Sequence, residues 1–123
     1  MTVVNELNRE LEKLDSEHGV EISAVITRSG APIAWHLPHG ISAETIATLS
    51  ATIFGASEVI FTGSGWDKPH KVTVETSPNG IMVTRSLGRK AILVLMSHKL
   101  DAAELEKKAG EAEVRIREVM QNE

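Results

Sequence analysis

The stretch from residue 42 to 62, SAETIATLSATIFGASEVIFT, constrains the fold most, because it predicts a long helix with two apolar sides. Ser42 is expected to cap its N-terminus, and Glu44 follows in the first turn, where a negative charge suits the helix dipole. One stripe, expected to face the core, has the helical i, i+3, i+4 spacing and contains Ile46, Leu49, Ile53, Ala56 and Ile60. The second apolar stripe contains Ala43, Ala47, Ala51, Phe54 and Phe61, interrupted only by Glu58.

A helix that is apolar on two sides is buried on both of them. The chain has 123 residues, which we expect to form a single domain with one core, so no second domain remains to cover the other side. A partner molecule is therefore expected on that side. The pattern leaves open which of the two stripes faces the sheet.

Composition excludes several classes of function. The net charge is −4 and only four residues are aromatic, with no basic stripe, which argues against nucleic acid as a partner. The absence of cysteine excludes disulfides, thiolate metal ligands and cysteine nucleophiles. The N-terminus lacks a signal-peptide apolar segment, and no apolar run is expected to reach the roughly 18 residues of a membrane span. We therefore expect a cytoplasmic protein without membrane insertion.

The remaining segments predict two further helices and five strands. A helix with one apolar stripe is expected over residues 3–18 and another over 101–121. The strands are expected at 20–27, 31–36, within 66–77, at 81–85 and at 91–96. Short turns make both groups of strands antiparallel. The run AILVLM at 91–96 shows no alternation, which indicates a central strand covered on both faces.

These elements predict an α/β/α sandwich of the α+β type. A five-stranded antiparallel sheet would carry the long helix on one face and the other two helices on the opposite face. Pro69 is tolerable only near an edge, so the strand that follows it is expected at the edge of the sheet.

This order of elements resembles the Roadblock/dynein light chain superfamily, including its prokaryotic gliding-motility regulators, which share a profilin-like fold. The similarity lies in GVEISAVITRSGAPIAW, the long helix rich in small residues, KVTVETSPNGIMVTRSLGRKAILVLM and the closing helix, and it covers nearly the whole chain. It implies one Roadblock-like domain over residues 1–123 that forms dimers by pairing long helices and by joining two sheets at the third strand. It further implies a non-catalytic adaptor or regulator of a small Ras-like GTPase, without a cofactor.

The predicted interface combines the second stripe of the long helix with the edge strand. The dimer contacts assigned in this way are Ala47, Ala51, Phe54, Glu58, Phe61, Val72, Thr73 and Val74. Trp66 and Arg28 are assigned to binding of a further partner. An exposed indole beside an edge strand suits an interface hot spot, and packing of Trp66 over the dimer edge or the core is the alternative. Arg28 lies near a strand end, where it would either act in trans on a nucleotide or be solvated.

Other chemistry has weaker support. The spacing of His36 and His39 is compatible with binding of a metal ion, but zinc needs further ligands. We therefore favour the interpretation that both are surface histidines. No nucleophile elbow and no converging pair of carboxylates indicates catalysis. The alternative functions are a sensory module that holds a small ligand between helix and sheet, and a structural dimerisation unit for a protein scaffold.

Overall fold

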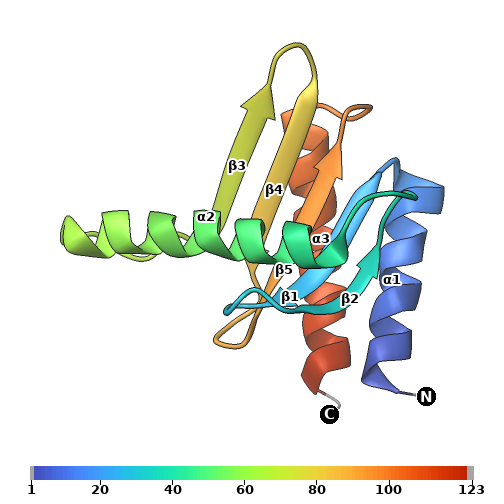
Figure 1. Ribbon diagram of the computed structural model, residues 1–123, viewed down its shortest axis with the longest axis horizontal. Helices are drawn as coiled ribbons and strands as arrows, with labels where there is room; N and C mark the ends of the chain where they lie inside the picture. The colour runs from blue at the N-terminus through green and yellow to red at the C-terminus, as the bar shows by residue number, and fades with distance from the viewer. Residues whose placement is uncertain (1, 122–123) are drawn as a thin grey trace.

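The computed structural model describes residues 2–121, which form a five-stranded antiparallel sheet with helices on both faces (Figure 1). In chain order the elements are α1 (Val3–His18), β1 (Ile22–Thr27), β2 (Pro32–His36), α2 (Ala43–Gly63), β3 (Lys71–Thr76), β4 (Gly80–Ser86), β5 (Ala91–Ser97) and α3 (Ala102–Gln121). Helix α2 lies on one face of the sheet, and α1 and α3 lie on the other. The predicted α/β/α sandwich is confirmed.

The sheet has the strand order β2-β1-β5-β4-β3, so β5 is central and β3 is an edge strand, as predicted. In β5, Leu93 and Leu95 pack under α1 and α3, whereas Ile92 and Val94 pack under α2. Both faces of this strand are covered, which explains why its sequence is apolar without alternation.

Local signals set the ends of the helices. The Thr2 hydroxyl accepts a hydrogen bond from the Asn5 backbone N–H at the start of α1, and Gly19 ends this helix in the left-handed conformation with φ 75°. The Ser42 hydroxyl accepts from the Thr45 N–H at the start of α2, as predicted.

Strand β3 begins at Lys71, five residues later than the first residue of the predicted segment. The preceding residues form a loop, because the Trp66 N–H bonds back to the Phe61 carbonyl and Pro69 has no N–H to give to a sheet.

By length and composition, α2 is long and apolar enough to cross a membrane. This differs from the expectation that no run reaches that length, because Glu44 and Glu58 are the only charged residues in the helix. In the folded chain, however, Ala47 and Phe54 of α2 are fully buried against the sheet.

Candidate functional site

The two apolar stripes of α2 have the opposite roles to those predicted. Ala47, Ala51 and Phe54 are buried against β1 and β5, so their assignment to the dimer interface is wrong. The small side chains at 47 and 51 let the helix approach the sheet closely, and Phe54 fills the space beside them. The stripe expected to face the core is largely the outer one: Leu49, Ile53 and Ile60 are exposed, and only Ile46 packs partly against the core.

Phe61 differs from the other members of the sheet-facing stripe. It follows Ala47 and Phe54 at intervals of seven residues, close to two helical turns, so its side chain leaves α2 on the same side. The C-terminal part of α2 extends beyond β3, however, and no strand of the described chain lies beneath it (Figure 1). Phe61 is therefore 36% exposed, and its ring lies beside that of Trp66, with ring centroids 5.8 Å apart. Its assignment to an interface stays a prediction.

Arg28 and Glu58 form a cluster inside the chain. The Arg28 guanidinium donates to the Glu58 carboxylate at 2.8 Å, to the Ser86 hydroxyl at 2.8 Å and to the Gly88 carbonyl at 3.1 Å. It also lies 5.3 Å from the centre of the Phe54 ring. All three guanidinium nitrogens are thus engaged, so the geometry favours a structural role over the predicted partner-binding role of Arg28. Glu58 is likewise engaged within the chain.

The free edge of β3 offers unpaired backbone groups. The His70 carbonyl accepts from the Ser86 N–H, and Val72 is paired with Thr84. Because successive residues of a strand direct their backbone groups to opposite sides, the groups of Lys71, Thr73 and Glu75 point away from β4. The edge is regular over its six residues. Val72, Thr73 and Val74 thus lie where an edge-to-edge contact would form, and their interface role stays a prediction.

The other edge of the sheet is poorly suited to pairing. Strand β2 starts at Pro32, and its register with β1 shifts between Val25 and Ile26. Proline and bulges are common devices that protect an edge strand. β3 is therefore the better candidate for pairing with another chain.

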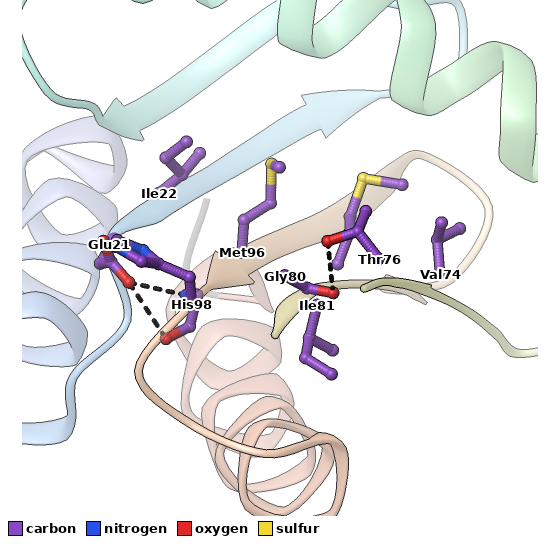
Figure 2. A pocket seen from close by; sticks show the side chains of 10 residues that line it. Glu21, Ile22, Val74, Thr76, Gly80, Ile81, Met96 and His98 are labelled. Carbon is purple, nitrogen blue, oxygen red and sulfur yellow. Dashed lines mark hydrogen bonds and ion pairs between the residues drawn. The ribbon is translucent and has the colours of Figure 1, made fainter. Parts of the chain in front are cut away.

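An apolar groove lies on the α2 face of the sheet, at the end that α2 does not cover (Figure 2). It has a volume of about 330 Å³. Its floor is a row of neighbours on four strands, Ile22 beside Met96, Met96 beside Met82, and Met82 beside Val74. No local sequence pattern indicates this groove, because its existence depends on where α2 crosses the sheet.

A contact between Glu21 and His98 closes one end of the groove. The Glu21 carboxylate lies 2.6 Å from His98 Nδ1 and accepts the His98 backbone N–H at 2.7 Å. Burial alone would raise the pKa of Glu21, but that hydrogen bond and the charges of His98 and Lys99 together hold it below its ordinary value. Glu21 therefore stays ionised at neutral pH, and this end of the groove is polar.

Two further carboxylates link α3 to the sheet. Glu106 accepts the Thr73 hydroxyl at 2.7 Å and lies 3.5 Å from Lys71, and these contacts lower its pKa despite partial burial. Burial would raise the pKa of Glu113, but its hydrogen bonds from Arg85 and Arg117 lower it. Thr73 and Lys71 thus hold the edge strand against α3.

The histidines do not converge. His36 Nε2 lies 2.8 Å from the Asp15 carboxylate and links β2 to α1, and His39 lies in the loop before α2. Within residues 2–121, no group of three or more histidine or acidic side chains is placed to hold a metal ion.

An α/β/α domain with a free edge strand and an apolar outer helix face belongs to the class of protein-interaction domains. The chain is a member of the Roadblock/LC7 domain family, which matches residues 6–97. No curated protein matches it by sequence.

Solved structures show the same fold. MglB of Myxococcus xanthus superposes with a TM-score of 0.87 at 12% identity, over 97% of this chain and 90% of that chain. A structure described as MglB with tetrameric arrangement gives 0.86 at 17% identity, over 99% and 93%. Profilin IB of Acanthamoeba castellanii gives 0.62 at 17% identity, over 90% and 96%. Family and fold together support a regulatory or adaptor role.

Proposed function

We propose that this protein is a non-catalytic, cytoplasmic adaptor that pairs with a second copy of itself and binds a small Ras-like GTPase. The observation that carries the proposal is the outer face of α2, where Leu49, Ile53 and Ile60 are exposed, on a sheet whose strand β3 has a free edge. Contiguous apolar surface on a small domain marks a site of interaction. Family membership and the likeness to MglB, one structure of which has a tetrameric arrangement, support the assignment.

Self-pairing and GTPase binding would use different sides of α2. The Thr48 hydroxyl donates to the Gly30 carbonyl, so one flank of the helix faces the turn between β1 and β2. Ile53 and Ile60 lie on the opposite flank, toward the apolar groove, where α2 of a second copy would pack. Leu49 and Ala56 point directly away from the sheet and would stay accessible on a pair of helices. We assign this outermost line to the GTPase.

The residues along this surface are apolar or small, and offer no nucleophile, general base or free arginine to the nucleotide. Any effect on hydrolysis or exchange would therefore come from repositioning the switch segments of the GTPase itself.

The test is binding to purified Ras-like GTPases from the same genome, each loaded with GDP or with a non-hydrolysable GTP analogue. Leu49→Asp should abolish binding, because it would place a charge in the centre of an apolar contact. Val114→Asp on α3 is the matched control, since Val114 is 59% exposed and Leu49 57%. Absence of binding in both nucleotide states, or equal loss in both variants, would contradict the GTPase assignment.

A second candidate function rests on the apolar groove. Its volume of about 330 Å³ lies at the lower end of the range for small-molecule sites, so a sensory role remains the alternative. Its lining is almost entirely apolar, whereas a selective ligand site combines apolar walls with several convergent polar groups. This composition favours a protein side chain as the occupant.

A further inference from the structure

Helix α2 covers only one end of the sheet, and the position of the apolar groove follows from this. Its Glu58 is bonded to Arg28 at the end of β1, and Val72 near the start of β3 packs against the buried cluster that contains Phe54. The opposite end of the same face carries Val74, Met82 and Met96, and no helix of residues 2–121 lies above it (Figures 1 and 2). Part of an apolar face is therefore left without a cover.

Charge selects one register for pairing β3 with β3 of a second copy. An antiparallel pair centred on Thr73 would place Lys71 opposite Glu75 of the second copy, and the reverse, so two pairs of opposite charges form. The outward backbone groups of residues 71, 73 and 75 would all face one another. A pair centred on Lys71 or on Glu75 would set like charges opposite each other, and one centred on Val72 would set Glu75 against Pro69, which has no N–H. A pair centred on Val74 would set Lys71 against Ser77 and Glu75 against Thr73, so no pair of opposite charges forms.

This register brings the second copy's α2 over the uncovered groove. The two strands run in opposite directions, so the start of β3 in one copy lies beside the end of β3 in the other. Each α2 crosses its own β3 near Val72 and continues past it (Figure 1). Its projecting end would therefore lie over Val74 and Met82 of the other copy.

We propose that the apolar groove of each copy is filled by Phe61 of a second copy, with Trp66 packed behind it. The Phe61 side chain leaves α2 on the side that faces the sheet, but at a point past the edge of its own sheet (Figure 1). Trp66 lies beside Phe61 and is 68% exposed. Two methionines in the groove suit an aromatic occupant, because their flexible thioethers adapt to a ring and make favourable sulfur–aromatic contacts. The proposal rests on the self-pairing proposed above and adds the residues that cross between the copies.

The chain contains no cysteine, so disulfides form only between introduced cysteines. The single variants Phe61→Cys, Val74→Cys and Met82→Cys measure the links between identical positions of two copies, and their rates are subtracted. Two variants combine Phe61→Cys with Val74→Cys or with Met82→Cys. The matched control combines Phe61→Cys with Val114→Cys, which is exposed on the opposite face. Each is oxidised at low protein concentration and analysed on non-reducing gels, with circular dichroism to confirm folding and light scattering to give the mass in solution.

At least one groove pair is expected to form disulfide-linked dimers at least about tenfold faster than the control, because paired copies hold the cysteines at a high effective concentration. A dimer mass with no cross-linking above the control would overturn the groove assignment and leave self-pairing intact. A monomer mass for the unmodified protein would overturn both.

A second readout avoids changing Phe61. In Trp35→Phe the indole of Trp66 is the only one left, and its emission should move to shorter wavelength as the protein concentration rises through the dimerisation range. Unchanged emission across a measured monomer–dimer transition would overturn the proposal.

Discussion

Exchanging the charges at the edge of β3 is the most direct test of how two copies join. Glu75→Lys would place lysine opposite lysine at two symmetric positions in the register centred on Thr73. The double variant Lys71→Glu with Glu75→Lys would restore two pairs of opposite charges in reversed order. Glu75→Lys is the cleaner single variant, because Lys71 already lies 3.5 Å from Glu106 within its own chain.

The expected size follows from the exposure of these groups. Lys71 is 37% exposed at its side chain and Glu75 is exposed, so each pair is worth about 0.5 kcal/mol and its reversal adds repulsion of similar size. Two symmetric pairs give about 2 kcal/mol, which corresponds to roughly a 30-fold weaker dimer.

Sedimentation equilibrium over a range of concentrations measures the dimer dissociation constant of each protein. The difference between Glu75→Lys and the unmodified chain should shrink at about 1 M salt, where the Debye length is roughly 3 Å. The double variant should recover most of the lost affinity. The register would be refuted if the single variant dimerises as well as the unmodified chain, or if the double variant is weaker still in spite of an intact fold.

Three further predictions concern the single chain. Phe54→Ala should lower the free energy of unfolding by about 3–5 kcal/mol, measured by urea denaturation, since Phe54 is fully buried; a loss below about 1 kcal/mol would contradict its core placement. The pKa of Glu113 is lowered in the folded chain, so its contacts with Arg85 and Arg117 stabilise the fold above its ordinary value of 4.5, and this contribution is lost as the pH falls through and below that value. Glu113→Gln should therefore lower stability at pH 7 and flatten the acid limb of the stability–pH curve; an unchanged acid limb would contradict this linkage. Gly55→Ala should raise the free energy of unfolding by up to about 1 kcal/mol, because this helical position has no neighbour within 4 Å of an added Cβ; destabilisation would show that α2 packs more tightly there.

Much of the fold follows from local sequence patterns. The unbroken apolar run from 91 to 96 predicts the central strand, because a strand that is covered on both faces has apolar side chains on both faces. Ser42 and Gly19 mark helix ends through hydrogen bonding and backbone conformation, which are properties of the residues themselves. Pro69 points to the edge strand for the same kind of reason, since it lacks a hydrogen-bond donor.

The periodicity of apolar residues does not determine which side of α2 faces the sheet. Both stripes are apolar at helical spacing, so the pattern reports that two sides are covered and not which one meets the sheet. Residue size was the available signal: Ala47, Ser50 and Ala51 let a backbone approach a sheet, whereas Leu49 and Ile53 do not. Phe54 belongs to the small-residue side and fills the remaining space, which the sequence does not reveal.

The interior role of Arg28 depends on contacts between residues far apart in the chain. Its partners Glu58 and Ser86 follow it by 30 and 58 positions, and no spacing rule connects them. No spacing rule predicts the groove either, because its floor is formed by single residues from four strands.

The arrangement of the two faces determines which surface stays accessible when the molecule is attached through a terminus. Helix α1 begins and α3 ends at the same end of the molecule, in the layer on the far side of the sheet from α2 (Figure 1). A dye, an affinity tag or a fused domain attached at either terminus would therefore project away from the α2 face. Immobilised by its terminus, the protein would present α2 to the solution, and attachments on two joined copies would leave from the same side of the extended sheet.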